Sequence, residues 1–204
     1  MHSSVGNNTG YINLVLIPLI KNLLTRYTNK DILITCGSKA GIEINEFLEK
    51  NEIANIDIKT LMQKDFLNYV VKSELFITSP GMTTIYETCK YDKDTILLPP
   101  QNLSQYYNSE FAKKLIKRIK LIKWNKEELN LDYLRQYFYL GEDNVVEIIY
   151  KNINAASKDI KYKDNLYKRI GSILKRNFID RKVIYFDENG TETIVRELFK
   201  WDAQ

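Results

Sequence analysis

Short apolar runs alternate with amphipathic segments over residues 31–124, and this alternation constrains the fold more than any other feature. The apolar runs occupy residues 31–36, 56–58, 75–78, 95–98 and 119–124. Between them, residues 42–49, 65–72, 83–90 and 105–117 repeat apolar side chains three and four positions apart, which is typical of helices. Strands and helices that alternate in this way form a parallel sheet with helices on both faces. Residues 1–125 therefore predict an α/β domain.

An amphipathic segment precedes these strands. Residues 11–27 carry apolar side chains at helical spacing, and Pro18 predicts either a kink or the true first turn of the helix. Residues 5–10, Val-Gly-Asn-Asn-Thr-Gly, have the composition of a loop that follows a strand. Residues 37–41 contain two glycines and predict a second loop of this kind.

The last third of the chain, residues 126–204, is charged and rich in tyrosine. Residues 128–138, 144–153 and 166–174 each predict an amphipathic helix. Residues 182–186 are typical of a short strand and residues 187–190 of a turn. Residues 191–201 predict a helix, with a hairpin through Asn189 and Gly190 as the alternative. We expect residues 126–204 to form a mainly helical extension packed on the domain of residues 1–125.

The composition, with 44% hydrophobic and 27% charged residues among 204, is that of a globular protein. The longest apolar run, residues 14–20, contains a proline and is shorter than the roughly 20 residues of a membrane span. The amino terminus does not resemble a signal peptide, so we expect a cytoplasmic protein. Cys36 and Cys89 are expected to be buried free thiols, and His2 is the only histidine. The sequence predicts neither a zinc site nor a histidine base within the chain.

The formal net charge of +4 is mild, and we expect no binding to nucleic acid. Basic residues cluster between Lys113 and Lys126, where no acidic residue occurs, and again between Lys158 and Lys182. Such stretches are typical of a solvated face. The alternative is an anionic partner, such as the inner membrane surface or a polyanionic acceptor.

Residues 75–90 predict an anion-binding corner. An apolar strand ends at Ser79-Pro80-Gly81, and Thr83 and Thr84 then open a helical segment. The unpaired N–H groups and the dipole at the start of a helix attract anions. Glu87 follows one turn later and can accept hydrogen bonds from sugar hydroxyls. These residue types suit a phosphorylated and hydroxylated ligand.

A second motif follows the next strand. Pro99 and Pro100 stiffen the loop after that strand, and Gln105 and Asn108 lie one turn apart on the helix beyond it. Carboxamides both donate and accept hydrogen bonds, which suits sugar hydroxyls.

Together, the two motifs resemble the donor-binding half of GT-B glycosyltransferases. Residues 73–114 are similar to the group that includes the bacterial lipid-linked muropeptide N-acetylglucosaminyltransferase. In that group a strand, a serine- or glycine-containing turn, paired small residues and a glutamate precede an apolar strand, a proline and a Gln-x-x-Asn-Ala helix. The matching residues here are Ser79, Gly81, Thr83, Thr84, Tyr86, Glu87, Pro99, Gln105, Asn108 and Ser109. Weaker similarity covers residues 5–124, with Asn7 where the first loop of the family usually has a second glycine.

The resemblance implies a Rossmann-like parallel sheet, the carboxyl-terminal half of the GT-B fold, that binds a nucleotide sugar. It implies that residues at the corner contact the diphosphate, that Glu87 contacts the ribose, and that the two carboxamides face the sugar. It also implies that Gly37 and Ser38 lie near the base and that Gly6 and Asn7 belong to the first glycine-rich loop. The residues implied are Gly6, Asn7, Gly37, Ser38, Ser79, Gly81, Thr83, Thr84, Glu87, Gln105 and Asn108.

The implied reaction is an inverting transfer that needs neither metal nor cofactor, with a UDP-sugar as the favoured donor. Enzymes of this family carry the general base on the amino-terminal half. We therefore expect the acceptor-binding half and the base to belong to another domain or a separate subunit. The sequence specifies neither the sugar nor the acceptor. The alternatives are a sugar-nucleotide hydrolase of the same fold and a non-catalytic interaction domain.

Overall fold

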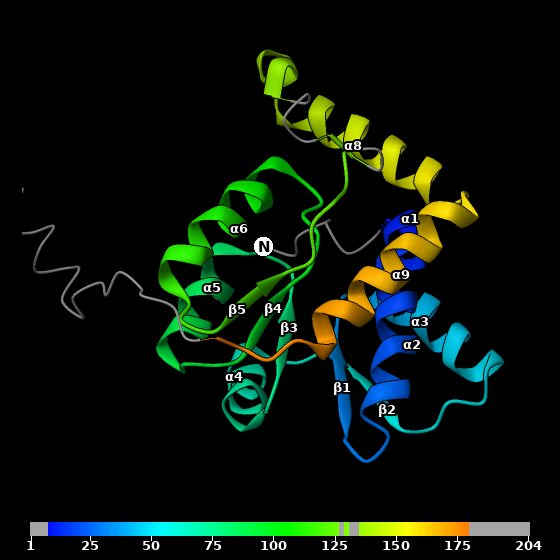
Figure 1. Cartoon of the computed structure of the whole chain (residues 1–204), viewed down its shortest axis with the longest axis vertical. Coiled ribbons are helices and arrows are strands. Elements are labelled where there is room, and N and C mark those ends of the chain that lie inside the picture. The colour runs from blue at the N-terminus through cyan, green and yellow to red at the C-terminus, as the bar shows by residue number, and fades with distance from the viewer. Residues whose placement is uncertain (1–7, 127–128, 131–134, 180–204) are drawn as a thin grey trace, which may run out of the picture.

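The computed structural model describes residues 8–126, 129–130 and 135–179, which form an α/β fold with parallel strands (Figure 1). The strands are β1 (Ile32–Thr35), β2 (Ile56–Lys59), β3 (Phe76–Thr78), β4 (Thr95–Leu97) and β5 (Ile119–Leu121). The helices between them are α3 (Ser38–Lys50), α4 (Gln63–Lys72), α5 (Met82–Lys90) and α6 (Leu103–Leu115). This order confirms the predicted alternation of strands and helices.

The described strands pair into two parallel sheets. β1 pairs with β2, with Ile32 opposite Ile56. The other sheet has the order β3-β4-β5, and Ile96 on β4 lies between Ile77 and Lys120. Because the strands within each sheet run parallel, their carboxyl ends lie at one edge, where ligands bind in open α/β sheets.

Helices cover both faces of the β3-β4-β5 sheet, as predicted. Leu97 packs in one core with residues of α5 and α6, including Ile85 and Ala112. Ile96 packs on the opposite face, because successive side chains of a strand point to opposite sides. That second core also contains Ile149 and residues of the two helices α8 (Glu142–Ala156) and α9 (Ile160–Lys175). The predicted helices at residues 144–153 and 166–174 are therefore confirmed.

One long helical segment joins the two sheets. It consists of α1 (Thr9–Tyr11), a π-helical turn over Ile12–Leu16, and α2 (Ile17–Arg26). The N–H of Ile17 bonds to the carbonyl of Ile12, five residues earlier, and Pro18 occupies the first turn of α2. The helical segment begins nine residues before Pro18, so Pro18 opens α2 without marking the true start of the helix. The π-helical turn precedes the residue that has no N–H to donate. Leu14 packs in the large core, whereas Ile12 packs with β1, β2 and α3.

Two predictions of local structure are wrong. Residues 37–41 do not form a loop, because α3 begins at Ser38 and Gly41 lies in its first turn. Buried side chains at Ala40, Ile44 and Leu48 give this helix a continuous apolar face from its start, which the two glycines obscured.

The predicted helix at residues 128–138 is also wrong where the structure describes it. Leu129 is buried in the large core and its N–H bonds to the carbonyl of Asn125, but neither Leu129 nor Asn130 is helical. Arg135–Leu140 form a 3-10 helix. The strand and turn predicted at residues 182–190, and the helix or hairpin predicted beyond them, lie outside the described residues.

Candidate functional site

The turn between β3 and α5 forms a corner with free backbone donors. Gly81 is the N-cap residue of α5, and its N–H bonds to the carbonyl of Ser79 at 2.7 Å. No described side chain caps this helix end, and the first intrahelical bond runs from Ile85 to the carbonyl of Gly81. The N–H groups of Met82, Thr83 and Thr84 therefore lack intrahelical partners. With the helix dipole, they make the corner weakly positive and suited to an anion.

The two carboxamides on α6 are placed by contacts with the backbone. Asn108 donates through Nδ2 to the carbonyl of Pro80 at 3.0 Å, which ties α6 to the corner. Gln105 is 7% exposed, and its Oε1 accepts from the N–H of Gln101 at 2.9 Å. Asn102 caps α6 by accepting from the N–H of Gln105. Each predicted sugar-binding carboxamide therefore stabilises the site through one polar atom and can present the other, Oδ1 of Asn108 or Nε2 of Gln105.

Two aromatic residues brace the loop between β4 and α6. Tyr11 donates its hydroxyl to the carbonyl of Pro99 at 2.8 Å, and Trp124 donates through Nε1 to the carbonyl of Pro100 at 2.6 Å. Tyr11 is completely buried, and burial raises the pKa of its hydroxyl although a hydrogen bond from Gln101 opposes the shift. Neither aromatic residue was predicted from the sequence, because no local pattern links them to the prolines.

Glu87 lies one turn into α5, on the helix that starts at the corner. Its Oε1 accepts a hydrogen bond of 3.0 Å from Nε2 of Gln63, the first residue of α4. Gln63 was not predicted from the sequence either. An exposed glutamine at the start of a helix carries no local signal for a contact 24 residues away.

Gly37 and Ser38 lie at the start of α3, where Gly37 is the N-cap residue. The loop between β2 and α4 is bonded to the segment just before Gly37, since Oγ1 of Thr60 donates to the carbonyl of Cys36 at 3.3 Å. Gln63 follows that loop and joins it to α5. The structure thus brings both loops to the same edge as the corner, with no direct hydrogen bond among the described residues from Ser38 to α5. Cys36 is a free, half-buried thiol whose pKa is raised by burial.

The fold does not itself require glycine at positions 37 and 81. Both have negative φ angles, −69° and −78°, which any residue can adopt. A Cβ at Gly37 would meet no atom within 4 Å, and one at Gly81 would meet only Oγ1 of Thr84 at 3.7 Å. By contrast, a Cβ at Gly10 would lie 2.1 Å from Oδ1 of Asn154. Glycine at 37 and 81 instead leaves the adjacent N–H groups accessible to a ligand.

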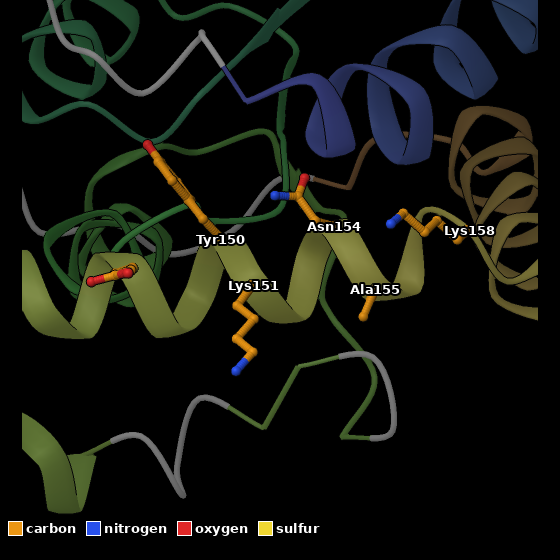
Figure 2. A pocket seen from close by; sticks show the side chains of 6 residues that line it. Tyr150, Lys151, Asn154, Ala155 and Lys158 are labelled. Atoms are coloured by element: carbon orange, nitrogen blue, oxygen red, sulfur yellow. The ribbon is translucent and has the colours of Figure 1, made fainter.

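The remaining predicted residues, Gly6 and Asn7, lie outside the described residues. A groove of about 490 Å³ runs along α8 and contains none of the predicted site residues (Figure 2). Asn154 points from it towards α1, whereas Lys151 points away. Its lining residues are Glu147, Tyr150, Lys151, Asn154, Ala155 and Lys158.

In the part of the chain that the structure describes, no three acidic, histidine or cysteine side chains are grouped as a metal site would require. The sequence does contain an Asp-x-Asp spacing at Asp92 and Asp94. Asp94 immediately precedes β4 and pairs through both carboxylate oxygens with Arg118, at 2.7 and 2.9 Å. This pair therefore lies at the amino ends of the strands, on the edge opposite Gly81.

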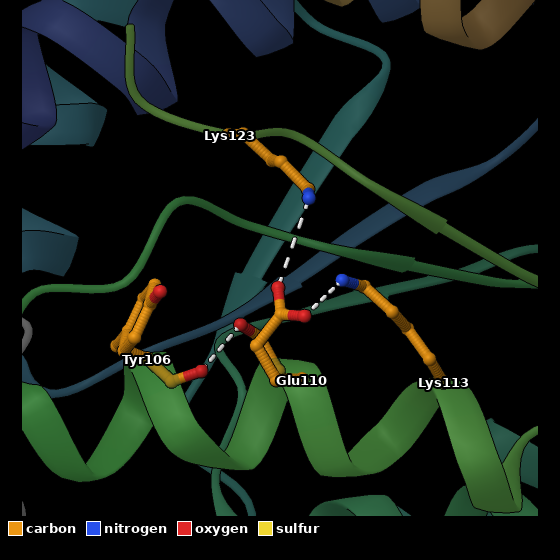
Figure 3. A network of polar contacts seen from close by, with 5 residues as sticks. Tyr106, Glu110, Lys113 and Lys123 are labelled. Atoms are coloured by element: carbon orange, nitrogen blue, oxygen red, sulfur yellow. Dashed lines mark hydrogen bonds and ion pairs between the residues drawn. The ribbon is translucent and has the colours of Figure 1, made fainter. Parts of the chain in front are cut away.

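The basic stretch between residues 113 and 126 is partly neutralised within the fold. Glu110 lies between Lys113 and Lys123, with 3.7 Å to Nζ of Lys123 (Figure 3). Burial raises the pKa of Glu110, but the two lysines outweigh this effect and lower it.

Lys120 is also used internally. Its Nζ donates to the carbonyl of Ile173 at 3.2 Å and to that of Arg176, at the end of α9. It also lies 3.7 Å from the ring centre of Phe178. Burial lowers the pKa of Lys120, which is consistent with this half-buried position. Several basic residues of the stretch therefore stabilise the fold.

No helix among the described residues is both long enough and apolar enough to cross a bilayer.

Among protein families, the one described as glycosyltransferase family 28 C-terminal domain matches residues 11–163. Comparison with curated proteins gave no match. The family match contains all the described strands and the predicted corner, and it confirms the resemblance to GT-B glycosyltransferases. The narrower muropeptide group stays a prediction. The chain therefore belongs to the glycosyltransferase family 28 C-terminal domains, the donor-binding half of glycosyltransferases.

Proposed function

We propose that this chain binds a nucleotide sugar, with UDP-sugar favoured, at the corner between β3 and α5. The observation that carries the proposal is the uncapped start of α5, which presents free N–H groups with Glu87 one turn away. The diphosphate contacts Gly81, Thr83 and Thr84, and the ribose hydroxyls bind Glu87. Two negative charges at a helix start are stabilised by the dipole and by charge-assisted hydrogen bonds.

The remaining parts of the donor occupy the flanking loops. Gln105 and Asn108 face the sugar, because Asn108 ties α6 to the carbonyl of Pro80 at the corner and Gln105 lies one turn before it on the same helix. Ser79 flanks the diphosphate, and Gly37 and Ser38 lie near the base. We assign Gly6 and Asn7 to the donor site as well, on the resemblance of their sequence to the first glycine-rich loop of the family.

The chemistry at this corner is an inverting transfer. The acceptor oxygen attacks the anomeric carbon, and the bond from that carbon to the diphosphate oxygen breaks with its electron pair. Negative charge then develops on the leaving nucleoside diphosphate, next to the N–H groups of α5. Preorganised donors of this kind stabilise the charge directly, and we propose that the transfer is metal-independent on this ground.

The acceptor hydroxyl also has to lose its proton to a base within hydrogen-bonding distance. We place this base, together with the acceptor site, on another domain or a separate subunit that faces the same edge. Large side chains are exposed around that edge, among them Met62 (78%), Met82 (39%) and Tyr107 (45%). An apolar rim of this kind suits a docking half.

Contact with the cytoplasmic membrane surface is a further part of the proposal. Lys161, Lys168 and Lys175 are exposed at seven-residue intervals on α9, with Tyr167 exposed beside them. Lysines on one helix face attract anionic lipids. Co-sedimentation with vesicles that contain anionic lipid, compared with neutral vesicles, measures this attraction, and equal binding to both would refute it.

Thermal unfolding with nucleotides tests the donor site. A ligand present at one hundred times its dissociation constant adds about 2.7 kcal/mol to the free energy of unfolding. UDP and UDP-sugars should therefore raise the melting temperature, more than GDP or CDP, with or without EDTA. If none of these nucleotides changed the melting temperature, the proposed donor site would be wrong. An effect that disappeared in EDTA would refute metal independence alone.

A further inference from the structure

The hydrogen bond between Gln63 and Glu87 joins two helices at the proposed donor site. Gln63 opens α4, and its Nε2 lies 3.0 Å from Oε1 of Glu87 on α5. The loop before Gln63 is itself fixed, because Thr60 is bonded to the carbonyl of Cys36. The carboxamide therefore reaches Glu87 from a backbone that is held from the other side.

The chemistry of the pair differs from that of a lone carboxylate. An ionised glutamate only accepts hydrogen bonds, whereas each hydroxyl of a ribose both donates and accepts. Gln63 uses one of its two Nε2 hydrogens on Glu87 and keeps the other as a donor. Glu87 keeps Oε2, because its bond with Gln63 is made through Oε1. Side by side, the two side chains offer an acceptor and a donor to a vicinal diol.

The contact also restricts Glu87 before a ligand arrives. A glutamate side chain has three rotatable bonds, and ordering it on binding reduces affinity. A hydrogen bond from a neighbouring helix orders the carboxylate in advance. Such support improves binding only for a ligand group that the carboxylate itself contacts.

We propose that Gln63 is a positioning residue that orients Glu87 and, with it, distinguishes ribose from 2′-deoxyribose. This inference rests on the proposed function, since it deepens the assignment of Glu87 to the ribose.

The test compares UDP with 2′-deoxy-UDP by isothermal titration of the full chain. Gln63→Ala should weaken UDP binding about fivefold, because one hydrogen bond within the ribose site is lost. Its effect on 2′-deoxy-UDP should be about twofold or less, since the group that the pair distinguishes is missing. Gln136→Ala is the matched control, because Gln136 is exposed on the 3-10 helix and should leave both affinities unchanged.

Two further variants separate orientation of Glu87 from a general effect on the fold. In a Glu87→Ala background, Gln63→Ala should weaken UDP binding less than it does in the wild type, because the part of its effect that acts through Glu87 is already lost. Gln63→Glu should weaken UDP binding more than Gln63→Ala, since two adjacent carboxylates repel each other. The melting temperatures of all variants without nucleotide should match that of the wild type.

Equal losses for UDP and 2′-deoxy-UDP in Gln63→Ala would overturn the inference while leaving the donor site intact. An effect of Gln63→Ala on UDP binding that is as large in the Glu87→Ala background as in the wild type would do the same. If the wild type bound neither nucleotide, the proposed function would be wrong and the inference would fall with it.

Discussion

Replacing Gly81 with alanine separates a role in ligand binding from a role in the fold. Gly81 has φ −78° and ψ 139°, which alanine adopts without strain. The new methyl group would lie 3.7 Å from Oγ1 of Thr84, an ordinary van der Waals contact. The protein without nucleotide can therefore accept this change, whereas a diphosphate approaching the start of α5 would meet the methyl group.

The expected magnitudes follow from these contacts. Alanine reduces the entropy of the unfolded chain, which stabilises a protein by about 0.4–1 kcal/mol at a compatible position. Alanine is also a poorer N-cap than glycine, at a cost of up to about 1 kcal/mol. These effects nearly cancel in the free energy of unfolding. Loss of one hydrogen bond to the charged diphosphate removes about 1.5–3 kcal/mol, so UDP affinity should fall about 10- to 150-fold.

The assay is a UDP titration combined with thermal unfolding of the same samples. Gly10→Ala serves as a matched control, because a Cβ there would lie 2.1 Å from Oδ1 and 2.9 Å from the backbone Cα of Asn154. A clash with the backbone cannot be relieved by a side-chain rotation, so we expect Gly10→Ala to cost about 1–3 kcal/mol of stability.

Two results would refute this reasoning. If Gly81→Ala bound UDP as tightly as the wild type, the diphosphate would not lie at this corner. If Gly81→Ala lost as much stability as Gly10→Ala, the fold itself would require glycine at position 81.

Three further predictions concern single side chains. Glu87→Ala should lower UDP affinity about tenfold in titration without changing the melting temperature, because only exposed Gln63 loses a partner. Tyr11→Phe should cost about 2 kcal/mol in urea unfolding, since the buried carbonyl of Pro99 loses its donor; an unchanged midpoint would contradict this. The pKa of Glu110 is lowered in the folded state, so its contribution to stability is present at neutral pH and lost as the pH falls through that pKa. Unfolding midpoints of Glu110→Gln should therefore fall less steeply in acid than those of the wild type, and equal slopes would show that its lysine partners do not stabilise the fold.

Local sequence predicted most of the elements correctly. The spacing of apolar residues decides whether a short segment can bury one face as a helix or a strand. The corner at Ser79–Gly81 was predictable on the same basis, because a strand that ends in Pro-Gly before helical spacing leaves free N–H groups. Prediction failed at Gly41, where packing of Ala40 and Ile44 outweighed the preference of glycine for loops. It also failed at Leu129, where burial in the large core replaced the helix that its spacing suggested.

Sequence alone determined the α/β class, the order of elements and the residues of the strand–turn–helix corner where we propose that the donor binds, since each depends on neighbours within a few positions. Only the tertiary structure decided which residues support that corner. Asn108 on Pro80, Tyr11 on Pro99 and Gln63 on Glu87 are contacts across 28, 88 and 24 residues. They exist because crossover helices return the strands in parallel, which gathers the carboxyl ends and the helix starts at one edge. No local spacing encodes that juxtaposition, so it follows only from the packed fold.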